Sequence, residues 1–203
     1  ALSLLLTQDL EKGNNEISSA IWSALKGKDY VEEIIVPTEQ KSWQQALGDN
    51  PLVNLDNRLT LNKQQALAFS QLLFQEGFNV WLLEGVTGSG KTEIYLQYIE
   101  EVLKKGKQVL VLVPEIGLTP QTVRRFQARF NVEIDVLHSN LNDTQRLNVW
   151  ERARTGQSAI VIGTRSALFT QFSDLGLIIL DEEHDGSFKQ QDGWRYHARD
   201  LGI

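Results

Sequence analysis

A glycine-rich stretch before the midpoint of the chain could bind phosphate. Residues 85–92, GVTGSGKT, match the pattern G-x-x-x-x-G-K-[ST]. Glycines let the backbone curl so that its N–H groups point at phosphate oxygens, Lys91 adds a positive charge, and the Thr92 hydroxyl can ligate Mg²⁺. The candidate nucleotide-binding residues are Gly85, Val86, Thr87, Gly88, Ser89, Gly90, Lys91 and Thr92. The alternative is a glycine-rich turn that contains a lysine by chance.

A cluster of acids about ninety residues later could supply the carboxylates that phosphate chemistry needs. Asp181 and Glu182 directly follow the apolar run Leu177–Leu180. We expect Asp181 to hold Mg²⁺ together with Thr92, and Glu182 to orient and deprotonate an attacking water. An acidic cluster alone is more often a solvated loop. Its combination with the phosphate loop favours ATP hydrolysis.

These residues require an α/β scaffold, and the pattern from Val80 onward predicts one. Apolar runs predict buried strands at residues 80–85, 108–114, 132–138, 159–164 and 177–182. Helical spacing predicts helices at residues 91–106, 119–130 and 142–156. Thr119 and Asn142 are expected N-caps, and Gly106 and Gly156 are expected C-caps. The alternation predicts a parallel sheet with helices on both faces, with Asp181 at its ligand-binding edge.

The first part of the chain has a different pattern. Residues 1–13 and 16–36 predict two helices, and the residues after them are rich in turn formers such as Pro51. We therefore predict a small, mainly helical segment over residues 1–40, a linker over residues 41–58, and the α/β domain over residues 59–203.

The composition is that of an ordinary globular protein, with 203 residues, 41% hydrophobic and 23% charged. The chain has no cysteine, which excludes disulfides and a thiolate zinc site. A net charge of −6 argues against wholesale wrapping of nucleic acid but permits a local contact, and the arginines of the second half are interpreted as solvated helix faces. Without a membrane-spanning run or signal peptide, we expect a cytoplasmic protein with no membrane partner. The absence of methionine indicates a piece of a longer protein.

Together these motifs resemble those of superfamily 2 helicases, and most closely those of the bacterial primosomal helicases that restart replication. Asp181 to His184 resemble the Walker B (DEAH) box of the family. The wider set covers about Leu61 to Asp200 and consists of GVTGSGKTEIYL, LVPEIGLTPQT, VIGTRSALF and DEEHDGSFKQQDGWRYHARD. The resemblance implies a P-loop NTPase fold of the RecA-like type, the first motor lobe of an ATP-dependent 3′-to-5′ DNA helicase.

The resemblance also implies roles for further residues. Gln65, in LNKQQ, would read the adenine edge, and His184 would relay a proton. The candidates for contact with DNA are Pro114, Glu115, Gly163, Thr164, Arg165, Trp194, Arg195 and Tyr196. The Trp194 and Tyr196 rings can stack on unpaired bases while Arg195 contacts a phosphate or base plane. Alternatives stay open for both. The rings either anchor their loop on the domain or pack against a part of the protein outside this chain, and Arg165 forms an ion pair within the domain.

The expected partners follow from the same resemblance. They are forked and single-stranded DNA, single-stranded DNA-binding protein and other primosome proteins. Residues 1–40 would correspond to part of a winged-helix module, and a zinc module and second motor lobe would lie outside this chain. We therefore expect the chain alone to bind ATP and Mg²⁺ weakly and to hydrolyse ATP poorly.

Two other functions remain open at this point. One is another superfamily 2 DNA translocase, such as a fork-reversal helicase or the motor of a restriction enzyme. The other is a non-catalytic interaction module that depends on nucleotide, against which the intact Lys91, Asp181 and Glu182 count.

Overall fold

The computed structural model describes residues 19–28, 30, 40–73 and 77–203. The chain divides into two units, Ala1–Glu39 and Gln40–Ile203. The described residues of the first unit contain the helix α2 (Ser19–Lys26). The helix predicted over residues 1–13, and most of the correspondence to a winged-helix module, lie outside the described residues.

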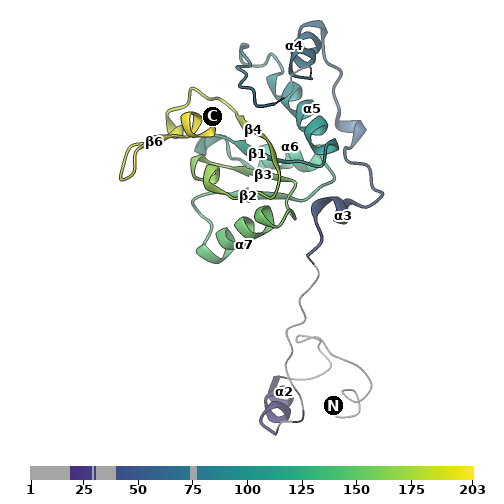
Figure 1. The fold of residues 1–203 in the computed structure, drawn as a ribbon, viewed down its shortest axis with the longest axis vertical. Coiled ribbons are helices and arrows are strands. Elements are labelled where there is room, and N and C mark those ends of the chain that lie inside the picture. The colour runs from purple at the N-terminus through teal and green to yellow at the C-terminus, as the bar shows by residue number, and fades with distance from the viewer. Residues whose placement is uncertain (1–18, 29, 31–39, 74–76) are drawn as a thin grey trace. The chain divides into compact units, whose positions relative to one another are not determined.

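A parallel sheet of four strands forms the centre of the second unit (Figure 1). Its strands are β1 (Gln108–Leu112), β2 (Ile134–Leu137), β3 (Ile160–Gly163) and β4 (Leu175–Leu180). They lie in the order β2-β3-β1-β4. Val111 of β1 is in register with Ile162 of β3 on one side and with Ile179 of β4 on the other. The carboxyl ends of all four strands therefore meet at one edge, as predicted.

Helices cover both faces of this sheet: α5 (Lys91–Lys104), α6 (Pro120–Arg129) and α7 (Asp143–Arg154). Successive residues of a strand point to opposite faces. Val109 and Val111 therefore pack with α5 and α6, while Leu110 and Leu112 pack with α7 on the other face. Two apolar cores on either side of a parallel sheet make this the RecA-like α/β fold that was predicted.

The ends of these helices follow their sequence signals. The Thr119 hydroxyl accepts a hydrogen bond from the first turn of α6, at 3.2 Å. Asn142 and Gln145 form a reciprocal capping box at the start of α7. Gly106 and Gly156 follow α5 and α7 with φ angles of 79° and 74°, a left-handed conformation that suits glycine. These cap predictions are confirmed.

The strand predicted at residues 80–85 is wrong. Residues 78–86 form neither helix nor strand, and the side chains of Val80, Trp81 and Leu82 are 58%, 46% and 73% exposed. Within the described part of the chain, β4 pairs with β1 alone, and no strand lies beside residues 80–85. An apolar run becomes a strand only where a neighbouring backbone completes its hydrogen bonds.

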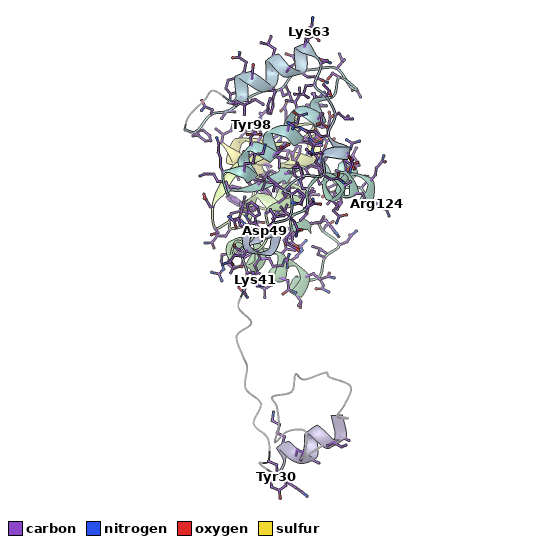
Figure 2. All side chains as sticks on the ribbon, turned by 90° about the vertical axis from the view of Figure 1, so that its right-hand side faces the viewer. Tyr30, Lys41, Asp49, Lys63, Tyr98 and Arg124 are labelled. Carbon is purple, nitrogen blue, oxygen red and sulfur yellow. The ribbon has the colours of Figure 1, made fainter. Side chains whose placement is uncertain are left out.

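Residues 41–58, interpreted from the sequence as a linker, pack on the α/β unit. The helix α3 (Trp43–Leu47) places Trp43, 3% exposed, in the same core as α5 and α6. Lys41 and Asp49, which flank α3, are exposed (Figure 2). This segment therefore contributes to the core of the domain that follows it. The boundaries of the domains stay a prediction.

Short elements complete the unit. They are η1 (Leu55–Asn57), α4 (Lys63–Leu73), η2 (Glu115–Gly117), η3 (Arg165–Phe169), η4 (Gly186–Phe188), β5 (Lys189–Gln190), β6 (Tyr196–His197) and α8 (Ala198–Gly202). β5 and β6 form an antiparallel hairpin. Among the described residues, none of the helices combines the length and the apolar character needed to span a bilayer.

Candidate functional site

The glycine-rich loop leads directly into the first turn of α5. Gly88 and Gly90 have φ angles of 81° and 82°, which glycine adopts without strain. Lys91 is the first residue of α5, and its Nζ donates a hydrogen bond to the Gly85 carbonyl at 2.6 Å. The loop thus curls around an ammonium group at a helix N-terminus, where backbone N–H groups attract anions. This geometry suits a bound phosphate.

Gln65 lies against this loop. Its Nε2 donates to the Ser89 carbonyl at 2.8 Å, although 24 residues separate the two in sequence. Its Oε1 accepts from the Asn62 backbone N–H at 2.8 Å, as part of a capping box at the start of α4. The structure therefore brings Gln65 to the phosphate loop and engages both ends of its amide with backbone. Its role in reading adenine stays a prediction.

Asp181 is connected to the phosphate-loop helix through Tyr95. The Tyr95 hydroxyl donates a hydrogen bond to Asp181 Oδ2 at 3.1 Å. Burial raises the pKa of Tyr95 above its ordinary value and the Asp181 carboxylate raises it further, whereas a hydrogen bond with the Thr92 side chain lowers it. Thr92 and Asp181 therefore lie beside the same phenol. The structure brings together the loop and the acid that were expected to share a ligand.

Thr92 and Asp181 fit a magnesium ion that is bound with a nucleotide. Among the described residues, no group of three or more His, Cys, Asp or Glu side chains could hold a metal ion. Mg²⁺ is typically held by one or two protein ligands together with substrate phosphates and water. One hydroxyl and one carboxylate beside a phosphate loop match that pattern.

Glu182 has an unusual backbone conformation. Its φ of 52° is the only positive value for a residue other than glycine in the described part of the chain. Such a conformation costs about 1 kcal/mol or more and is common at functional sites. Glu182 Oε2 lies 3.6 Å from His184 Nε2, and the two side chains are 49% and 75% exposed. The predicted base and the predicted relay are therefore neighbours that face solvent.

The DNA-contact candidates after β1 and β3 differ in their exposure to solvent. Pro114, Gly163 and Thr164 are buried, whereas Glu115 is exposed. A Cβ atom at Gly163 would lie 2.8 Å from the Leu137 carbonyl oxygen and would collide with Ala167. Packing therefore accounts for the glycine, and the buried residues would need their backbone groups to touch a ligand.

Arg165 makes contacts within the domain. Its Nη1 donates to the carbonyl oxygens of Ser187 and Lys189, each at 2.9 Å. These residues belong to η4 and β5, which lie between the acidic cluster and the aromatic run. Arg165 thereby fixes the start of the hairpin through backbone carbonyls of its own domain, and not through the ion pair that the sequence left open.

Trp194 and Tyr196 form an aromatic group with Phe169, a residue that the sequence analysis did not single out. The Phe169 ring centroid lies 5.7 Å from that of Trp194 and 5.2 Å from that of Tyr196. The Trp194 and Phe169 side chains are nonetheless 70% and 49% exposed. The rings therefore anchor one another and still present aromatic surface to solvent. The signal for Phe169 was an aromatic residue at the end of the GTRSALF motif.

A polar hollow of about 460 Å³ lies beside this aromatic group. It is lined by Lys189, Gln190, Gln191, Arg195, Tyr196 and His197. Arg195 and Lys189 give it positive charge, and Tyr196 belongs both to the hollow and to the aromatic group. The hollow and the aromatic group are therefore adjacent and share the Tyr196 side chain.

The comparisons with known proteins agree with this arrangement. The profile of the DEAD/DEAH box helicases matches residues 62–202. The chain belongs to the DEAD/DEAH box helicase family. This match includes the phosphate loop, the acidic cluster and the aromatic group.

Within the helicase family, replication restart proteins are close relatives. The chain is 80% identical over all 203 residues to the replication restart protein PriA of Haemophilus influenzae, and it spans 28% of that protein. It is 49% identical to PriA of Bacillus subtilis over 148 residues, which are 71% of the chain and 18% of that relative. The predicted resemblance to superfamily 2 helicases, and to PriA in particular, is confirmed.

A solved helicase structure supports the fold. The structure of RecG bound to a three-way DNA junction is similar, with a TM-score of 0.56 and 29% sequence identity. The similarity covers 62% of this chain and 18% of the RecG chain.

Proposed function

We propose that this chain is the first motor lobe of an ATP-dependent 3′-to-5′ DNA helicase, which assembles the primosome at stalled forks. The observation that carries the proposal is the hydrogen bond between Tyr95 and Asp181, because it joins the phosphate-loop helix to the acidic cluster. The 80% identity to PriA supports the restart role over that of a fork-reversal or restriction motor.

In this proposal the loop residues bind the nucleotide and the acids act on water. Lys91 exchanges the Gly85 carbonyl for phosphate oxygens, and Thr92 and Asp181 hold Mg²⁺. When bound, the ion would neutralise negative charge on the phosphates. Glu182 orients the attacking water and accepts its proton, which the neighbouring His184 relays to solvent.

The aromatic group and the basic hollow would bind DNA. The exposed faces of Trp194 and Phe169 suit stacking on unpaired bases, and Arg195 with Lys189 suits the phosphates between them. Forked and single-stranded DNA are therefore the proposed ligands, with single-stranded DNA-binding protein and other primosome proteins as partners in the bacterial cytoplasm. The RecG structure bound to a DNA junction supports a DNA ligand.

The remainder of the protein completes the proposed motor. An arginine from a second lobe contributes about 10³–10⁵ to the rate in related phosphoryl-transfer systems. We therefore expect residues 1–203 alone to hydrolyse ATP poorly. The domain division at residues 1–40, 41–58 and 59–203, and a zinc module elsewhere in the protein, belong to the same proposal.

The proposed function is tested by replacing Trp194 with alanine in the complete protein. Stacking on an aromatic side chain contributes about 1–3 kcal/mol per base, and Trp194 is the most exposed ring of the aromatic group. We expect Trp194→Ala to lose the stimulation of ATP hydrolysis by single-stranded and forked DNA. The measurement is the rate of phosphate release over a DNA titration, with the rate without DNA as the reference.

The matched control is Trp150→Ala. Trp150 lies on α7 and contacts Arg154, outside the aromatic group. This variant should keep its stimulation by DNA. Undiminished stimulation in Trp194→Ala, or an equal loss in both variants, would contradict the proposed DNA site.

A further inference from the structure

Tyr95 occupies the junction between the two halves of the nucleotide site. It lies on α5, three residues after Thr92 and therefore on the same side of the helix. Its ring is stacked on Phe126 of α6, with centroids 6.4 Å apart and planes at 20°. Its hydroxyl reaches Asp181 at the end of β4. The Tyr95 ring is thus held by α6, and its hydroxyl is hydrogen-bonded to Asp181, the candidate magnesium ligand.

A phenol at this place can hold a carboxylate in one orientation. Tyrosine is protonated near neutral pH, so its hydroxyl donates to the charged Asp181. Hydrogen bonds to ionised acceptors are stronger than those between neutral groups. The bond uses Oδ2 and leaves Oδ1 for another ligand. The Asp181 backbone is also fixed, because its N–H donates to the Leu112 carbonyl at 2.9 Å.

We propose that Tyr95 is a positioning residue for the magnesium-binding carboxylate of Asp181. The proposal rests on the proposed function, since it assumes that Asp181 and Thr92 hold Mg²⁺ with a nucleotide. Tyr95 orients the Asp181 carboxylate toward the phosphate loop, which precedes α5, the helix that carries Tyr95. No other side chain in the described residues donates a hydrogen bond to Asp181.

The test is Tyr95→Phe in the complete protein, which keeps the stacked ring and removes the hydroxyl. Binding of a fluorescent, non-hydrolysable ATP analogue is measured by anisotropy over a titration of Mg²⁺, and again in EDTA. Loss of a partner that orients a metal ligand typically weakens metal affinity about 10- to 100-fold. We expect the Mg²⁺ concentration for half-maximal binding to rise at least about tenfold, while binding in EDTA changes less than about twofold.

Two controls separate positioning from a general effect on the fold. Tyr98→Phe changes the next tyrosine of α5, whose ring packs on the same core, and should match the unchanged protein. The second control combines Tyr95→Phe with Asp181→Asn. If Tyr95 acts through Asp181, the double variant should need no more Mg²⁺ than Asp181→Asn alone.

Each outcome has a clear meaning. An unchanged requirement for Mg²⁺ in Tyr95→Phe would overturn the inference, and so would equal weakening of binding in Mg²⁺ and in EDTA. If the unchanged protein binds the analogue without any dependence on Mg²⁺, the proposed function fails and the inference fails with it. A raised requirement for Mg²⁺ in the variants that carry Tyr95→Phe or Asp181→Asn, and not in Tyr98→Phe, supports both the inference and the proposed function.

Discussion

Replacement of Glu182 by glutamine is expected to lower the rate of ATP hydrolysis by the complete protein about 10³-fold. Glutamine has the size of glutamate but cannot accept a proton from water at neutral pH. Glu182 is held next to Asp181 in a positive-φ conformation and faces solvent, where an attacking water would approach. Lys91, Thr92 and Asp181 are untouched, so binding of the nucleotide should persist. The measurements are kcat for phosphate release and the affinity for an ATP analogue.

The neighbouring glutamate provides a matched control. Glu183 accepts a hydrogen bond from Arg199 Nη1 at 3.2 Å, so its carboxylate is engaged by α8. Glu183→Gln should change kcat less than about threefold, in line with its exposed ion pair. A similar loss in both variants, or full activity in Glu182→Gln, would remove Glu182 from the role of base.

The second prediction concerns the stability of the domain and depends on a buried ionic cluster. Arg129, at the end of α6, is 1% exposed and contacts two buried acids of α5. Its Nη2 lies 3.1 Å from Glu93 Oε1 and 3.9 Å from Glu100 Oε2. Its Nη1 donates to the Asn57 carbonyl at 2.7 Å. The Arg129 guanidinium thus compensates Glu93 and fixes the segment before α4. It shares Glu100 with Lys104, at 2.8 Å, and with Arg58, at 3.7 Å.

We expect Arg129→Met to lower the free energy of unfolding by about 3–5 kcal/mol. Methionine fills similar space but leaves Glu93 and Glu100 with less compensation in a buried site. Removing one partner of a buried pair exposes the full cost of the remaining charge. Urea unfolding followed by circular dichroism measures this change.

Arg124→Met is the control for this prediction. Arg124 lies on the same helix and is exposed at its outer surface (Figure 2). Substitutions at such positions usually change stability by less than about 0.5 kcal/mol. Equal stability of the two variants would mean that the buried cluster contributes no net stabilisation.

Local patterns in the sequence were sufficient for most of the scaffold. The phosphate loop combines a glycine pattern with a following helix, and the caps at Thr119 and Asn142 depend on neighbouring residues alone. The strands at residues 108–112 and 160–163 are apolar on both faces, as central parallel strands must be. Residues 80–85 have the same pattern but no neighbouring strand, which a local pattern cannot reveal.

Contacts between distant elements were beyond the sequence patterns. Arg129 was interpreted as part of a solvated helix face, because charged residues usually are, yet two acids of another helix bury it. Tyr95 and Phe169 were missed because their partners depend on how α5 meets β4 and how η3 meets the hairpin. Helical spacing from Thr92 was the one available signal for Tyr95.

The absence of a side chain at Gly163 affects how evolutionary variation should be interpreted. Ala167 and the Leu137 carbonyl leave room for a hydrogen atom and nothing larger. Selection would keep glycine at this position even in a descendant that had lost every nucleic-acid ligand. A conserved glycine there would reflect the close packing of β3 against η3 and β2. A harmful mutation at Gly163 would therefore indicate that the backbone had been displaced. Conservation of Gly163 alone could not identify this residue as a contact with nucleic acid.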